Sequence, residues 1–338
     1  MKYSRKDAKA YAREHMKGIW AAALMPFKAD LSIDEDGFRH NVAHWTEELG
    51  IDGLFIAGKQ GEFFSMSIEE RKRAFDLAVS ACAGRGATIM SCSDQNMDVV
   101  IDLARHAQKA GADYIVVHTP VLHFFKSHDE TVLNYYRTIA SKVDIGIALW
   151  SHPDSGYVMS PQLCNQLADI ENVVAIKYGV ERPIYKELTR LAGDRILVST
   201  ASEEEWFDNI VELGWQLYLC SSPPYLLQSA TDRRMRTYTD LAFSGKVEEA
   251  RAVRDGLNPI RAALRSTRPP EKPHAHQKYW QELLGQVGGG VRPPLLELTE
   301  QERAATRRAF EACGLQTGAV RKATGLRYST TVYRENRR

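Results

Sequence analysis

The chain has 338 residues, and its 44 lysines and arginines almost balance 43 aspartates and glutamates, which leaves a formal net charge of +1 at pH 7. That balance gives no overall field for nucleic acid or an anionic membrane, so neither is expected as a partner. Hydrophobic residues make up 44% and charged residues 26% of the chain, which is ordinary globular composition and argues against wholesale disorder. The length allows one large α/β domain with a smaller appendage.

The cysteines and the first residues bear on the cellular compartment. The five cysteines are odd in number and scattered, without a Cys-x-x-Cys pair for zinc or redox chemistry. We interpret them as reduced thiols and expect no metal site. The charged first residues are followed by no apolar signal segment, and no window approaches the ~20 apolar residues of a membrane-spanning helix. These features predict a soluble cytoplasmic protein.

Eight short apolar runs alternate with helical stretches through the first two thirds of the chain. This alternation is typical of βαβ units that build a parallel sheet. The runs are Trp20 to Met25, Gly53 to Ala57, Thr88 to Cys92, Tyr114 to His118, Ile145 to Trp150, Val173 to Lys177, Ile196 to Ser199 and Gln216 to Cys220.

Helix start signals lie between these runs. Ser67 and Glu70 have capping-box spacing and predict a helix through Val79, and Ser160-Pro161 predicts the start of another. No Gly-x-Gly-x-x-Gly follows the first run, which disfavours a doubly wound open sheet. The predicted fold class is therefore α/β, a closed (β/α)₈ TIM barrel.

After about residue 245 the strand pattern stops and helical spacing continues. The predicted helices there are Val247 to Leu264, Gln277 to Leu284 and Thr299 to Cys313. We expect them to form a helical domain that caps the barrel. The predicted divisions are an N-terminal extension (1–17), the barrel (18–244), a C-terminal helical domain (245–313) and a basic tail (314–338).

Lys177 is the first candidate for chemistry, because active sites of such barrels lie at the carboxyl ends of the strands and Lys177 ends an apolar run. An amine that loses hydration in an apolar barrel mouth is more easily deprotonated, and a free amine can form an imine with a carbonyl. The protonated imine then accepts electrons from the neighbouring carbon. The alternative is a lysine that ends a strand and reaches into solvent.

The segment Gly58-Lys59-Gln60-Gly61-Glu62 follows the second run directly. Its paired glycines allow a sharp turn whose N–H groups could bind a carboxylate, with Glu62 ordering the loop from below. An ordinary strand-to-helix turn is the alternative. Lys59 could offer a positive charge to the carboxylate or point outward as a surface lysine.

Further polar and aromatic residues stand at strand ends. His152 follows the fifth run, and His118 and His123 lie at the end of the fourth, where each could carry a proton. A lone histidine is more often structural. Trp150 would present a flat apolar face to a substrate. Two residues at the ends of the last two runs are also assigned to the substrate site, Thr200 and Leu219.

With these residues in view, the chain resembles the dihydrodipicolinate synthase and N-acetylneuraminate lyase family of class I aldolases. The segments that carry the resemblance are Ala23 to Phe27, Gly58 to Glu62, Ala175 to Lys177 and Val291 to Leu295. The resemblance implies a barrel with a C-terminal helical domain, a homo-oligomer that is often a tetramer, and no metal or organic cofactor. It also implies that Lys177 forms the imine with pyruvate or another 2-oxo acid, whose carboxylate the loop holds.

The departures from the family concern proton transfer. Lys59 and Gln60 stand where the family usually has hydroxyl side chains, Trp150 where it has an acid-base tyrosine, and Leu122 where a second tyrosine is expected. An indole N–H only donates a hydrogen bond and cannot replace that tyrosine. The nearest other proton carriers are His123, His152, Tyr178 and Tyr157. An arginine for a carboxylate-bearing aldehyde is also absent from 151–156, so dihydrodipicolinate synthase activity is not expected.

The aromatic content of the predicted mouth points to the second substrate. Trp150 is joined there by Phe63, Phe64, Phe124 and Phe125, although any single one of these phenylalanines could equally be core. The leading prediction is a lyase resembling hydratase-aldolases, which releases pyruvate and an apolar or aromatic aldehyde. A 2-oxo-3-deoxy sugar acid dehydratase or aldolase and a non-catalytic 2-oxo acid binding protein remain the alternatives.

Overall fold

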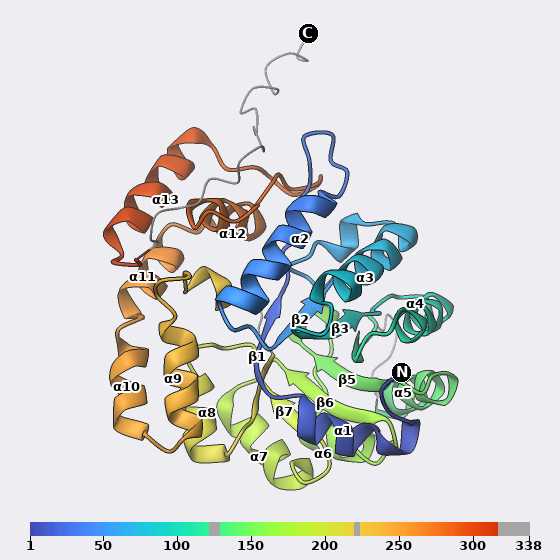
Figure 1. Ribbon diagram of the computed structural model, residues 1–338. Helices are drawn as coiled ribbons and strands as arrows, with labels where there is room; N and C mark the ends of the chain where they lie inside the picture. The colour runs from blue at the N-terminus through green and yellow to red at the C-terminus, as the bar shows by residue number, and fades with distance from the viewer. Residues whose placement is uncertain (122–128, 220–223, 317–338) are drawn as a thin grey trace.

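The protein is described by a computed structural model that covers residues 1–121, 129–219 and 224–316. Eight parallel strands stand at its centre with helices around them (Figure 1). The strands are β1 Gly18–Ala22, β2 Gly53–Ile56, β3 Ala87–Ser91, β4 Tyr114–His118, β5 Gly146–Ser151, β6 Val173–Tyr178, β7 Leu197–Ser199 and β8 Leu217–Leu219. Each strand overlaps a predicted run, with ends that differ by at most three residues, and the predicted (β/α)₈ barrel is confirmed.

The barrel closes through one ladder and one side chain. Strands β1 to β7 pair in sequence order, and β8 pairs with β1 in parallel, with Leu219 level with Trp20. Between β7 and β8 the Leu219 N–H donates to the Ser199 hydroxyl oxygen at 2.8 Å. The Ser199 hydroxyl therefore accepts the hydrogen bond that a backbone carbonyl would accept between two paired strands, here β7 and β8.

Register determines which side chains share the barrel mouth. His118 is level with Trp150, Trp150 with Lys177, and Lys177 with Ser199, on four neighbouring strands. Residues in register lie on the same face of a sheet. Lys177 reaches the ring of Phe55 on β2, across the interior, so this face points into the barrel.

In the part of the chain that the structure describes, eight helices cover the outside of the barrel. They are α2 Glu35–Ala43, α3 Ile68–Cys82, α4 Met97–Ala110, α5 Asp129–Lys142, α6 Pro161–Leu167, α7 Arg182–Ala192, α8 Trp206–Leu213 and α9 Arg234–Phe243. The predicted capping box of α3 is present, with Ser67 and Glu70 bonding reciprocally. Ser160 caps α6, whose first residue is Pro161, as predicted.

The first residues form a helix that sequence analysis left unassigned. Helix α1 (Ala8–His15) buries Ala8 and Ala12, which lie one turn apart. Tyr3 ties this segment to the barrel, because its hydroxyl accepts a hydrogen bond from the Gly146 N–H at 2.9 Å. Gly146 is the first residue of β5, so the segment lies at the amino end of the strands, opposite the mouth.

Four helices follow the barrel, coloured orange to red and gathered on one side in Figure 1: α10 Val247–Asp255, α11 Asn258–Ser266, α12 Pro273–Leu283 and α13 Glu300–Ala312. The single helix predicted from Val247 to Leu264 is wrong. Pro259 lacks an N–H and its ring excludes a continuous helix, so the chain breaks at Gly256. Helix α12 begins four residues before its predicted start, with Pro273 at its first position.

A smaller correction concerns the first strand. The first strand ends at Ala22, so Leu24 and Met25 lie beyond it, and the Leu24 N–H donates to the Tyr225 hydroxyl at 2.9 Å.

Cysteines 82, 92, 164 and 313 are buried free thiols, whereas Cys220 lies outside the described residues. In the described ranges, no helix is long and apolar enough to cross a membrane, and no group of His, Cys, Asp or Glu could hold a metal ion.

Candidate active site

Lys177 lies at the carboxyl end of β6 and is only 2% exposed. Its Nζ atom lies 4.9 Å from the centre of the Phe55 ring and 5.1 Å from that of Trp150. Ring faces carry partial negative charge and attract an ammonium, but they offer no proton acceptor comparable to a carboxylate. The amine is thus held inside the barrel mouth among aromatic surfaces, where a carbonyl carbon could reach it.

The loop after β2 has an unusual backbone at both of its ends. Ala57 and Glu62 adopt left-handed conformations, with φ of 50° and 58°, although neither is glycine. Within the loop, the Glu62 N–H donates to the Lys59 carbonyl at 3.1 Å and the Phe63 N–H to the Gly58 carbonyl at 3.3 Å. Such conformations cost about 1–3 kcal/mol each and persist where the surroundings fix them. The loop is therefore held in one shape.

The two loop glycines are required by space. A Cβ on Gly58 would lie 2.8 Å from the ring of Phe55, and one on Gly61 would lie 3.1 Å from the Ala23 carbonyl oxygen. Gly58 therefore rests on the same ring that contacts Lys177. Phe55 therefore contacts both the loop and the amine.

Glu62 fixes the loop from the side of the C-terminal helices. It is fully buried, and its Oε1 atom lies 2.5 Å from Nζ of Lys278 on α12, which is 1% exposed. The Arg292 N–H donates to the other carboxylate oxygen at 3.0 Å. Burial lowers the pKa of Lys278, against the raising effect of Glu62. The predicted ordering role of Glu62 thus has a geometric basis, supplied by a helix far along the chain.

A second residue of α12 holds the loop at Lys59. His274 Nε2 lies 2.9 Å from the Lys59 carbonyl oxygen, and a carbonyl only accepts, so this nitrogen carries the hydrogen. Burial lowers the pKa of His274, which keeps it neutral at pH 7. Helix α12 therefore fixes both ends of the segment predicted to bind a carboxylate.

The Lys59 side chain is exposed at the rim of the mouth, as predicted for a surface lysine. It forms an ion pair with Asp154, in the turn after β5, and both side chains are about half exposed. The Asp154 N–H in turn donates to His152 Nδ1 at 3.2 Å. Burial lowers the pKa of His152, and the cations of Lys59 and Lys177 lower it further, against Asp154. Lys59, Asp154 and His152 thus link the loops after β2 and β5 at the rim of the mouth.

Trp150 and His118 line the opposite wall. Trp150 is 5% exposed and meets both Phe55 and His118 nearly edge to face, with ring centres 5.6 and 4.6 Å away. His118 Nδ1 lies 2.8 Å from the Thr119 carbonyl oxygen, and burial lowers the pKa of His118 to about 4. His118 therefore lies beside Trp150 in the barrel mouth, a position that its place at a strand end did not by itself predict.

The two tyrosines considered as proton carriers point elsewhere. Tyr178 follows Lys177 on β6 and lies on the opposite face of the strand, where its hydroxyl donates to the Met159 carbonyl. Burial raises its pKa. The Tyr157 hydroxyl donates to Asp129, and burial raises its pKa as well. The structure brings neither hydroxyl to the amine of Lys177, so the sequence interpretation of Tyr178 as catalytic lacks the expected geometry.

The remaining predicted residues differ in how far they join the site. Thr200 is buried directly after β7, and its carbonyl accepts a hydrogen bond from the Ser199 hydroxyl at 3.3 Å. Leu219 is buried at the end of β8. Gln60 lies at the centre of the glycine loop and is partly buried. His123, Leu122, Phe124 and Phe125 lie outside the described residues.

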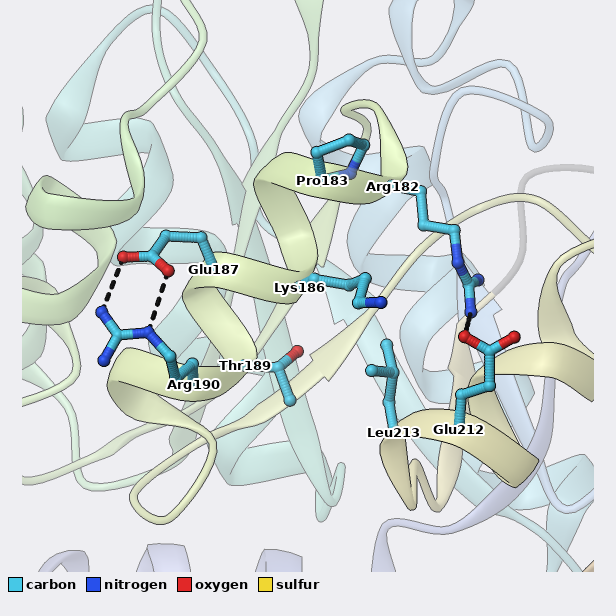
Figure 2. A pocket seen from close by; sticks show the side chains of 8 residues that line it. All are labelled: Arg182, Pro183, Lys186, Glu187, Thr189, Arg190, Glu212 and Leu213. Atoms are coloured by element: carbon cyan, nitrogen blue, oxygen red, sulfur yellow. Dashed lines mark hydrogen bonds and ion pairs between the residues drawn. The ribbon is translucent and has the colours of Figure 1, made fainter.

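A surface hollow of about 730 Å³ lies between α7 and α8, on helices that cover the outside of the barrel. Figure 2 shows that four of its charged side chains pair with one another, Arg190 with Glu187 and Arg182 with Glu212. None of its lining residues belongs to a strand end. We therefore assign the site to the barrel mouth around Lys177, where buried polar groups converge, and not to this hollow.

Comparison with known proteins gives the family. A model of the dihydrodipicolinate synthetase family matches residues 15–313. The chain belongs to this family. It is 27% identical to the 4-hydroxy-tetrahydrodipicolinate synthase of Methanothrix thermoacetophila over 308 residues, which is 90% of this chain and 99% of that one.

Solved structures show the same fold. The E. coli K12 prophage protein YagE, of the dihydrodipicolinic acid synthase family and in complex with pyruvate, superposes with a TM-score of 0.79 at 23% identity, covering 89% of this chain and 99% of that one. N-acetylneuraminate lyase from Fusobacterium nucleatum gives 0.78 at 23% identity, covering 89% and 100%.

Family membership settles several predictions. The suspected family is confirmed, and with it an enzyme of the class I aldolase type, a lyase. Curated relatives are named 4-hydroxy-tetrahydrodipicolinate synthase, the activity that the missing arginine argued against, so that exclusion stays a prediction. The homo-oligomer, the cytoplasmic location and the roles of the individual site residues also stay predictions.

Proposed function

We propose that this protein is a Schiff-base lyase that binds a 2-oxo acid on Lys177 and cleaves or forms the bond to an aldehyde, apolar or aromatic in character. The observation that carries the proposal is the buried Lys177 amine between the rings of Phe55 and Trp150, next to the anchored loop at 58–62. An imine at that position draws electrons from the adjacent carbon. The N–H groups of Lys59, Gln60 and Gly61 are the candidates for binding the carboxylate.

The aromatic lining supports the choice of second substrate. The rings of Phe55 and Trp150 lie beside the amine and the ring of His118 packs against Trp150, where a polyhydroxylated chain would need several polar partners. Unpaired polar groups cost about 1–3 kcal/mol each when buried. The preferred reaction is therefore addition of water to an arylidene pyruvate imine, followed by retro-aldol cleavage to an aromatic aldehyde and pyruvate. The reverse direction is aldol condensation.

The experiment that tests this proposal compares three substrates and follows the products by mass spectrometry. They are benzylidenepyruvate, a polyhydroxylated 2-oxo-3-deoxy acid, and pyruvate with an aldehyde that carries a carboxylate. We expect the first to give pyruvate and benzaldehyde fastest, with no product from Lys177→Ala. Faster turnover of the sugar acid would favour the dehydratase or aldolase alternative, and condensation of the carboxylated aldehyde would favour synthase activity.

A non-catalytic binding protein is the remaining alternative. It would form a reducible pyruvate adduct on Lys177 and yet turn over none of the three substrates. That combination would contradict the lyase proposal and leave only the binding site.

A further inference from the structure

Two polar groups in the mouth have no role in the proposed function so far. The indole N–H of Trp150 is buried and has no hydrogen-bond partner in the ranges 1–121, 129–219 and 224–316. An unpartnered buried donor is costly, by about 1–3 kcal/mol, and proteins rarely keep one without a use. The second group is the imidazole of His118, whose ring centre lies 4.6 Å from that of Trp150.

The free nitrogen of His118 is a hydrogen-bond acceptor. Its Nδ1 lies 2.8 Å from the Thr119 carbonyl oxygen, and that oxygen can only accept, so Nδ1 carries the hydrogen. A neutral imidazole has one N–H, which leaves Nε2 with a lone pair. Register with Trp150 places His118 on the face that points into the barrel. The wall therefore offers one donor, from Trp150, and one acceptor, from His118.

We propose that Trp150 and His118 form an oxygen site for the 4-hydroxyl group of the substrate imine, in which the indole N–H holds the oxygen and His118 takes its proton. This inference rests on the proposed function at Lys177. A hydroxyl group both donates and accepts, so it satisfies the pair at once. The same pair then binds the carbonyl oxygen of the aldehyde through the indole N–H.

The span from the amine fits this assignment. Four bonds of about 1.3–1.5 Å separate the imine nitrogen from the 4-hydroxyl oxygen, so the two atoms lie up to roughly 5 Å apart. The Trp150 ring centre lies 5.1 Å from Lys177 Nζ. The reach of an oxygen on the fourth carbon therefore matches the separation between the amine and the indole ring.

The reaction balances with these groups alone. His118 Nε2 takes the hydroxyl proton, the C–O bond becomes a carbonyl, and the bond between the third and fourth carbons breaks. Its electron pair moves to the protonated imine, which becomes an enamine on Lys177. In the opposite direction, protonated His118 returns the proton to the new alkoxide. After cleavage, protonated His118 gives its proton, directly or through water, to the terminal carbon of the enamine, and water then hydrolyses the resulting imine to pyruvate and the free Lys177 amine.

The ionisable groups around His118 come from two neighbouring elements. His152 and Asp154 lie in the turn after β5, and Lys177 lies on β6. Burial is the main reason that the pKa of His118 falls to about 4, and His152 and Lys177 add to it against Asp154. His118 is therefore neutral, and able to accept a proton, over the whole range from neutral to mildly acidic pH.

The test uses 4-hydroxy-2-oxo-4-phenylbutanoate, the aldol of pyruvate and benzaldehyde, with the full-length protein. His118→Asn keeps a donor for the Thr119 carbonyl and removes the acceptor nitrogen, and Trp150→Phe keeps an apolar ring and removes the N–H. Each variant should lower kcat for cleavage by about 100-fold or more. Both should still give a borohydride-reducible pyruvate adduct on Lys177, which also shows that they fold.

The pH profile separates proton transfer from a structural role. In the wild type, kcat/KM should fall at acid pH as His118 becomes protonated, and this acid limb should be absent in His118→Asn. Cleavage within about threefold of the wild type in both variants would overturn the inference. Loss of the pyruvate adduct in the variants would overturn it as well, because the pair would then act on imine formation. Absence of the adduct in the wild type would instead refute the function proposed for Lys177.

Discussion

The two walls of the barrel mouth differ in what holds them. The wall made by the loop at 58–62 is fixed by α12 through the buried pair Glu62 and Lys278 and through His274. The opposite wall, at the ends of β4 to β6, is built from rings and carries an unpartnered indole N–H among the described residues. By the sequence resemblance, the first wall corresponds to the family's carboxylate loop, and Trp150 on the second wall stands where a tyrosine is expected.

The difference indicates which residues of such a site can be substituted and which cannot. A loop locked by buried charges and left-handed residues tolerates few substitutions, because each would leave a buried group without its partner. Side chains that face the substrate from a strand end can change without disturbing the backbone beneath them. We therefore expect this protein to bind the 2-oxo acid as its family does and to use other groups for proton transfer.

The largest expected effect comes from breaking the buried pair that holds the first wall. Lys278→Met leaves the Glu62 carboxylate without its cation in the interior, which should lower the free energy of unfolding by about 3–5 kcal/mol. Urea denaturation measures the change. Lys246→Met, at an exposed lysine paired with Glu249, is the matched control and should cost less than about 1 kcal/mol. A loss below about 1 kcal/mol in Lys278→Met would show that α12 does not hold the loop.

The second expected effect is that the free energy of unfolding depends on pH because of His276 on α12. This residue is fully buried, its Nε2 atom lies 2.9 Å from the Thr267 hydroxyl oxygen, and burial lowers its pKa to about 4. The unfolded chain binds a proton below about pH 6.5, whereas the folded protein does not until about pH 4. Stability from this group is therefore complete above pH 6.5 and is lost as pH falls towards 4.

The measurement is the free energy of unfolding at pH 7 and pH 5. His276→Asn should reduce the drop between these two values by about 2 kcal/mol relative to the wild type. An unchanged drop would mean that His276 is not held neutral in the folded protein.

A smaller effect is expected from His274, the other contact of α12 with the loop. His274→Leu removes the hydrogen bond to the Lys59 carbonyl, which should weaken pyruvate binding by about 1 kcal/mol, or roughly fivefold, with little change in kcat. Adduct formation as a function of pyruvate concentration gives the affinity. His274→Gln, which can still donate, should recover most of it. Equal pyruvate affinity in His274→Leu and His274→Gln would show that the hydrogen bond from His274 to the loop does not support carboxylate binding.

The smallest effect is expected where the two walls meet at the rim. Lys59→Met breaks an ion pair between half-exposed side chains, so stability should change by less than about 1 kcal/mol and less still at high salt. Asp154→Asn should change stability by a similarly small amount. A tenfold or greater loss of pyruvate affinity in Lys59→Met alone would show that Lys59 leaves Asp154 and binds the carboxylate directly.

Local features were accessible from the sequence. Apolar runs located all eight strands, and the capping box at Ser67 and Glu70 located the start of α3, because both signals depend on residues close along the chain. Alternation along β6 would also have excluded Tyr178, since the residue after an inward Lys177 must point outward. Pro259 would likewise have indicated the break in the single helix that the apolar periodicity predicted over 247–264.

Long-range partners were not accessible in the same way. Nothing near Glu62 indicates that its cation comes from α12, and nothing near Lys59 indicates Asp154. Such pairs depend on how the barrel and the C-terminal helices pack. The importance of His118 likewise emerged only when register placed it beside Trp150 and the Thr119 carbonyl fixed its tautomer.

The most direct test of the central claim is to incubate the purified protein with pyruvate, reduce with borohydride, and locate the added mass by peptide mass spectrometry. Only an imine is trapped in this way. The account predicts a pyruvate adduct on Lys177 and none in Lys177→Ala. An adduct on another lysine, or none with pyruvate or any other 2-oxo acid, would contradict the proposed mechanism and leave the barrel without an assigned chemistry.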